Sequence, residues 1–123
     1  MRLWLILGAA SAFLSVAAGA FGAHALRARL TPDLLTIFET GARYHMYHSL
    51  GLIAIGLLGQ LRPSPMLNGA GWCLVVGIFL FSGSLYAMAL SGVRALGSIT
   101  PLGGLSFLVG WLLFAVVAWR HAN

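Results

Sequence analysis

Four apolar stretches, each close to the length that a helix needs to cross a bilayer, dominate the 123-residue sequence. They cover approximately residues 3–23, 44–61, 66–90 and 101–119. A helix crosses the ~30 Å hydrocarbon core with about 20 largely apolar residues, and backbone in lipid has to satisfy its own hydrogen bonds. The sequence therefore predicts an all-α fold: an integral membrane, antiparallel four-helix bundle that forms a single membrane domain over residues 1–123.

The small number of charges excludes a water-soluble domain. Hydrophobic residues make up 60% of the chain and charged residues only 7%, whereas soluble domains carry about 25% charged residues. Seven basic side chains against two acidic ones give a net charge of +5. The basic residues are scattered at the ends of the apolar stretches, as is typical of side chains that face lipid headgroups. The expected partners are therefore the lipid bilayer and other membrane proteins or a second copy of this chain, and no nucleic acid.

Residues 32–43 form an amphipathic segment after the first apolar stretch. Thr31-Pro32 is a helix-start signal, and Glu39 precedes Arg43 by four residues, the favourable order for a helical ion pair. We expect a short amphipathic helix that lies in the membrane interface. The pattern leaves open whether this helix is separate or runs unbroken into the second span.

Small residues recur along the predicted spans at helical spacing. Helices in lipid associate through close contacts between small residues, because lipid tails are as apolar as leucine. The first span carries one continuous small stripe, and Gly19→Leu is expected to disrupt its packing. The predicted packing residues are Gly8, Ala12, Ser15, Gly19, Gly77, Gly103 and Gly110.

Polar residues gather at one rim of the predicted bundle, because alternate helix ends meet there. The candidate ligand-binding residues are His24, Arg27, Arg43, Tyr44, His48 and Arg94. In one interpretation Arg43, Tyr44, His48 and Arg94 bind a lipid headgroup or a quinone, since arginine offers planar donors for phosphate. In a second, His24, His45 and His48 hold haem or a metal. In a third, these groups only cap helices, pair with Asp33 and Glu39, and extend toward the headgroups.

Neither a metal site nor a catalytic residue is predicted. The histidines lack a neighbouring cysteine, a second carboxylate and an HExxH motif, which argues against the haem or metal interpretation, and no cofactor is expected other than a bound lipid or quinone. A serine nucleophile needs a base within hydrogen-bonding reach, and no ionisable group is expected at the depth of Ser82, Ser84 and Ser106. Tyr86, at similar depth, is expected to donate a hydrogen bond to a neighbouring helix.

Four segments together resemble a known family. They are residues 19–26 (GAFGAHAL), 40–44 (TGARY), 81–86 (FSGSLY) and 100–111 (TPLGGLSFLVGW). In this order they resemble the YgdD-like bacterial inner-membrane proteins, which belong with vertebrate transmembrane protein 256 in a family of unknown function. The resemblance implies a small multi-pass protein of the bacterial inner membrane, with no activity or ligand to carry over. His24, Tyr44, His48, Tyr86 and Thr100 fall at motif positions, and His45 stands where glutamine is expected.

The first functional hypothesis is a non-enzymatic accessory or structural subunit of a larger membrane assembly. The alternatives are an interfacial lipid- or quinone-binding module and a haem or metal redox subunit. Side-chain counts place one more arginine on the His24 rim than on the opposite one. The resembling family carries its extra basic residues after the second helix and in the C-terminal tail, so we expect both termini in the cytoplasm.

Overall fold

The computed structural model describes residues 1–121, and these contain helices and turns but no strand. The elements in chain order are α1 (Arg2–Phe21), the π-helical η1 (Gly22–Leu26), α2 (Pro32–Leu61), α3 (Pro65–Gly77), the π-helical η2 (Ile78–Ser82), α4 (Gly83–Ser91), the 3-10 helix η3 (Arg94–Ser98) and α5 (Thr100–His121).

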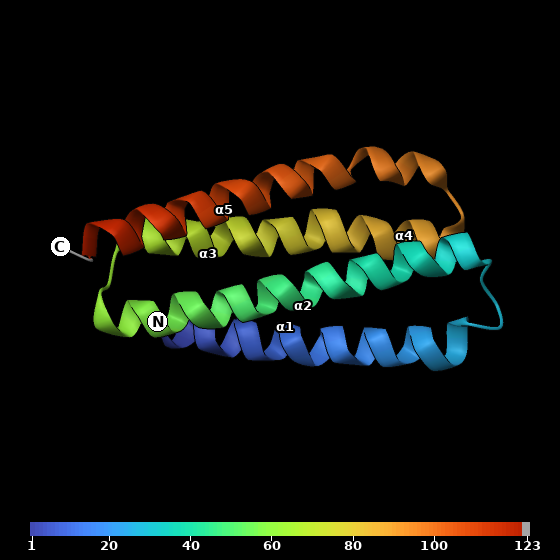
Figure 1. Ribbon diagram of the computed structural model, residues 1–123, viewed down its shortest axis with the longest axis horizontal. Helices are drawn as coiled ribbons and strands as arrows, with labels where there is room; N and C mark the ends of the chain where they lie inside the picture. Colours follow the sequence, from blue (N-terminus) through green and yellow to red (C-terminus); the bar gives the residue numbers. More distant parts are fainter. Residues whose placement is uncertain (122–123) are drawn as a thin grey trace.

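These elements join into four long helical rods that run side by side in alternating directions (Figure 1). The start of α1 and the end of α5 lie at the same end of the molecule (Figure 1). Three rods, Arg2–Leu26, Pro65–Ser91 and Arg94–Arg120, are long and apolar enough to cross a membrane. The rod α2, which holds the predicted span 44–61, is not among them, because polar side chains such as His45 and His48 lower its mean hydropathy.

Residues 32–43 are the first three turns of α2 and do not form a separate short helix. The Thr31 hydroxyl accepts a hydrogen bond from the Leu34 amide at 3.3 Å, which confirms the predicted start. No proline interrupts the chain from residue 33 to residue 61, so the helix continues through the predicted boundary. At 1.5 Å per residue α2 is about 45 Å long, longer than the ~30 Å hydrocarbon core.

The contact between α1 and α2 includes Gly8 and Ser15 of the predicted small stripe, but not Gly19. A Cβ on Gly8 would come within 3.0 Å of the Ser49 carbonyl, and the Ser15 hydroxyl donates to the Ala42 carbonyl at 2.7 Å. Met1, Gly8, Ser15 and Gly22 contact α2 at steps of seven residues, the repeat of left-handed helix pairs. On the α1 side the residues of this seam are Met1, Leu5, Gly8, Ser11 and Ser15, followed by Gly22 in η1.

Gly19 is not a packing residue of this seam. A Cβ built on it meets nothing within 4 Å. The neighbouring helices do not approach its α-carbon, although Leu5, two heptads earlier on the same face, packs against Gly56 of α2. Ala12, another predicted packing residue, is half-buried and lines a surface groove with Phe13 and Val16.

The glycines of the third and fourth rods lie where the backbones approach closely. An added Cβ on Gly110 would sit 2.8 Å from Leu74, and one on Gly77 would overlap the Phe107 ring. At Gly103 the obstacle is the backbone of Phe81. Glycines therefore let α3 and η2 pack closely against α5, as expected for membrane helices that associate through small residues.

Trp4 ties α1 to α3 near the end of the bundle where the chain begins. The indole is 1% exposed, its Nε1 donates to Asn68 Oδ1 at 2.8 Å, and its ring lies edge-on to Trp72 at 5.1 Å. A Cβ on Gly71 would come within 2.6 Å of the indole ring. Farther along the bundle the side chains of α1 and the third rod leave a cavity between them.

Candidate functional site

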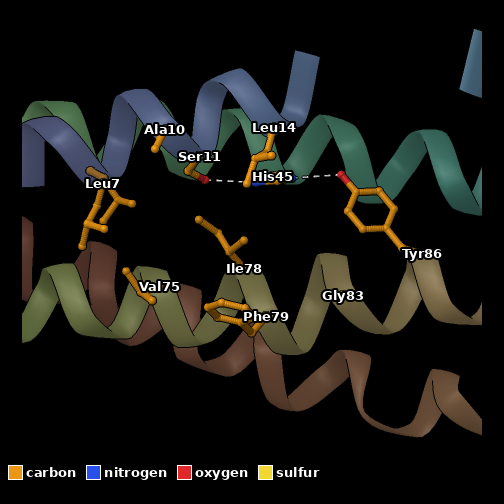
Figure 2. A pocket seen from close by; sticks show the side chains of 11 residues that line it. Leu7, Ala10, Ser11, Leu14, His45, Val75, Ile78, Phe79, Gly83 and Tyr86 are labelled. Carbon is orange, nitrogen blue, oxygen red and sulfur yellow. Dashed lines mark hydrogen bonds between the residues drawn. The ribbon is translucent and has the colours of Figure 1, made fainter. Parts of the chain in front are cut away.

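A cavity of about 400 Å³, here called the lateral cavity, lies between α1 and the rod formed by α3, η2 and α4 (Figure 2). Side chains of α2 form its floor. Three of the side chains that line it are polar: Ser11, His45 and Tyr86. The others are apolar and include Leu7, Leu14, Leu52, Val75, Ile78 and Phe79.

The three polar side chains form one hydrogen-bonded chain across three helices (Figure 2). His45 Nδ1 lies 3.0 Å from the Tyr86 hydroxyl on α4, and His45 Nε2 lies 3.0 Å from Ser11 Oγ on α1. Ser11 Oγ lies 2.6 Å from Ser49 Oγ, and Ser49 donates to the His45 carbonyl at 2.7 Å. We call Tyr86, His45, Ser11 and Ser49 the polar chain.

The polar chain lies near the middle of the bundle, not at its rim. Ser11 is at the centre of α1 and His45 is at the centre of α2, where it is only 8% exposed. This corrects the expectation that no ionisable group reaches the depth of Tyr86. The error arose because the second span was expected to begin near Tyr44, whereas the midpoint of the unbroken α2 falls between Met46 and Tyr47, close to His45. The expected contact from Tyr86 to a neighbouring helix is present, and its partner is His45.

The π-helical segment η2 shapes one wall of the lateral cavity. A π-helical turn is wider than an α-helical turn and often occurs at functional sites. Ile78 and Phe79, which are adjacent in the sequence, both line the cavity. Gly83 follows the segment, and a Cβ built on it meets nothing within 4 Å, so the cavity has free space at this residue.

His48 faces the opposite side of α2. Its Nδ1 donates to the Tyr44 carbonyl at 2.6 Å, and its ring stacks on Phe107 with centroids 3.4 Å apart and planes within 5°. Tyr44, Phe81 and Trp111 surround it in a second groove beside α5. The structure thus brings Tyr44 and His48 together, as predicted for the ligand-binding group, but in an aromatic setting.

The three histidines of the haem or metal interpretation do not converge. His45 points toward α1, His48 stacks against α5, and His24 is exposed in η1. Among the residues that the structure describes, no group of three or more histidine, cysteine, aspartate or glutamate side chains is placed to hold a metal ion.

The six predicted ligand-binding residues do not form one site either. Arg94 pairs with Asp33 in the first turn of α2, and both side chains are more than half exposed. His48 follows Asp33 by fifteen residues, which is about 22 Å along a helix. Arg27 and Arg43 are exposed on the surface. The unbroken α2 therefore separates residues that the sequence placed at a common rim.

Apolar rods joined by small residues and a buried polar chain define a small helical membrane protein. Within that class, the chain belongs to the family described as "Protein of unknown function (DUF423)", whose model matches residues 18–104. A UPF0382 membrane protein of Staphylococcus epidermidis is 47% identical over 123 residues, which is 100% of both chains.

Two further relatives carry the same name and no stated role. The UPF0382 membrane protein YwdK of Bacillus subtilis is 43% identical over 122 residues, covering 98% of this chain and 99% of the relative. A UPF0382 membrane protein of Staphylococcus aureus is 41% identical over 123 residues, covering 100% of each. No solved structure matches the chain.

Proposed function

We propose that this membrane protein binds one lipid-soluble molecule in the lateral cavity, with the polar head of that molecule at the polar chain. The cavity carries the proposal. Ligand sites typically enclose about 300–1,000 Å³ and combine apolar walls with a few converging polar groups, and this cavity has about 400 Å³ with Ser11, His45 and Tyr86 on one side. The proposal keeps the lipid or quinone class expected from the sequence but moves the site away from Arg43, Arg94 and His48.

The route into the cavity supports a ligand dissolved in the bilayer. Leu14 and Phe79 line the cavity from opposite sides and are 58% and 74% exposed. Both lie well inside their rods, so the opening between them faces sideways, toward the lipid that would surround the bundle. A molecule in the bilayer would reach the polar chain without passing through water.

The proposal includes the placement of the bundle in the membrane. All four rods, α2 included, cross the bacterial inner membrane as a four-helix bundle, with both termini in the cytoplasm and the first turns of α2 in the interface. The exposed side chains of Asp33 and Arg94 at the turns fit that placement. Labelling of a cysteine added at the C-terminus tests the orientation, and ready reaction with a membrane-impermeant reagent in intact cells would contradict it.

Two further expectations from the sequence stand as predictions. The first is the relationship to YgdD-like proteins and transmembrane protein 256, which is consistent with membership of the DUF423 family. The second is a role as a non-enzymatic accessory or structural subunit of a larger membrane assembly. Native pull-down tests this role, and recovery of the chain without any partner would contradict it.

Glycine substitutions provide the direct test of the ligand site. Gly83 lines the cavity and Gly19 does not, yet a Cβ on either meets nothing within 4 Å. The full chain is purified gently from native membranes and analysed by native mass spectrometry. The wild type and Gly19→Leu are expected to retain one apolar molecule, and Gly83→Leu is expected to lose it. Equal retention by all three proteins would overturn the proposal, and circular dichroism checks that each variant is folded.

A further inference from the structure

We infer that the lateral cavity selects a ligand whose head donates a hydrogen bond, such as a long-chain alcohol or a quinol, over one whose head only accepts. The inference rests on the proposed function and adds the chemistry of the head group. It follows from the direction of the hydrogen bonds in the polar chain, which the geometry fixes from one end.

The fixed end is the bond from Ser49 to the His45 carbonyl, at 2.7 Å. A carbonyl oxygen only accepts, so the single hydroxyl hydrogen of Ser49 is used there. Ser49 Oγ must then accept in its 2.6 Å contact with Ser11, and Ser11 is the donor. The hydroxyl hydrogen of Ser11 is therefore also committed.

The direction carries through the imidazole. Because Ser11 has donated its hydrogen, its oxygen accepts from His45 Nε2–H at 3.0 Å. A neutral imidazole has one N–H and one lone pair, so His45 Nδ1 is the acceptor. The Tyr86 hydroxyl, 3.0 Å away, must therefore donate to His45 Nδ1.

Every hydrogen of the polar chain is thus consumed within the protein. Tyr86 and Ser11, whose side chains line the otherwise apolar cavity, keep unshared lone pairs on their hydroxyl oxygens. A ligand hydroxyl can donate to such an oxygen, whereas an ether, ester or quinone oxygen finds no donor. In an apolar cavity an unpaired polar group is costly. A head group that carries a hydroxyl hydrogen is therefore bound more tightly than one that only accepts.

A matched pair of probes tests this inference. The full chain, in detergent and freed of co-purified lipid, is titrated with hexadecanol and with hexadecyl methyl ether, and binding is followed by native mass spectrometry. Hexadecanol is expected to bind about tenfold more tightly, the effect of one hydrogen bond of ordinary strength. Equal affinity, or a preference for the ether, would overturn the inference and leave the proposed function intact. Binding of neither probe would overturn the proposed function, and this inference with it.

The variant His45→Phe separates hydrogen-bond direction from shape. Phenylalanine keeps a planar ring, but Tyr86 no longer has Nδ1 to donate to and can offer its hydrogen to a ligand. The preference for hexadecanol over the ether is therefore expected to fall from about tenfold toward onefold. An unchanged preference in a folded His45→Phe protein would contradict the assigned direction. Gly83→Leu, which fills the cavity, should weaken the binding of both probes.

Discussion

His45 Nδ1 lies 3.0 Å from the Tyr86 hydroxyl, although 41 residues separate the two along the chain. The contact joins the centre of α2 to α4, and the bond from His45 to Ser11 adds α1. Three of the four rods therefore share one polar chain inside an otherwise apolar bundle. Hydrogen bonds between membrane helices contribute about 0.6–2 kcal/mol each, so the chain should matter for stability as well as for the proposed ligand.

Tyr86→Phe should destabilise the bundle. The change removes one hydroxyl from the polar chain and leaves His45 Nδ1 without its donor, while the ring can still pack against Phe38 at 4.9 Å. We expect the free energy of unfolding to fall by about 1–2 kcal/mol. The measurement is reversible unfolding in mixed micelles, followed by circular dichroism. Tyr47→Phe, at a half-exposed tyrosine outside the polar chain, is the matched control and should change little. Equal losses in the two variants would argue against the role of Tyr86.

Ser11 and Ser49 should behave as one unit. Each serine depends on the other for the direction of the bonds that end at the His45 carbonyl. Ser11→Ala and Ser49→Ala are therefore expected to be strongly non-additive, with a coupling energy of about 0.5–3 kcal/mol. A double-mutant cycle of unfolding free energies measures this coupling. Simple additivity would show that the two hydroxyls act independently.

Gly103→Ala and Gly19→Ala should have opposite effects. A Cβ on Gly103 would meet the backbone of Phe81, which cannot move aside, so overpacking is expected to cost about 1–3 kcal/mol. A Cβ on Gly19 meets nothing within 4 Å, and alanine favours the helix by up to about 1 kcal/mol. Thermal unfolding in one detergent compares the two variants. A loss of stability in Gly19→Ala would instead support the packing role that the sequence predicted for Gly19.

The ion pair between Arg94 and Asp33 should contribute little. Their side chains are 60% and 67% exposed, and exposed ion pairs typically contribute 0–1 kcal/mol. Arg94→Gln is therefore expected to lower the free energy of unfolding by less than about 1 kcal/mol. The exchange variant Asp33→Arg with Arg94→Asp, which keeps the pair but reverses it, serves as the control. A larger loss that the exchange restores would assign a structural role to the pair.

Much of the helical framework could be predicted from local sequence. The start of α2 follows from the Thr31 cap, and the end of α4 coincides with Gly92, whose φ of 75° suits glycine. The close approach at Gly77, Gly103 and Gly110 follows from residue size. The seam of α1 was harder to predict, because the small residues at Ala12 and Gly19 fit a helical stripe as well as Ser11 does. Only the partner helix selects between them.

The sequence by itself determined that the chain forms apolar helices and belongs in a membrane, because hydrophobicity and helix signals are local properties of residues. Only the tertiary structure decided that His45 faces Ser11 and Tyr86 while His48 faces Phe107. The two histidines are three residues apart, and a helix turns them through about 300°. Which neighbour each one meets therefore depends on how α2 is rotated between its partners, and that rotation is set by packing contacts between residues far apart in the sequence.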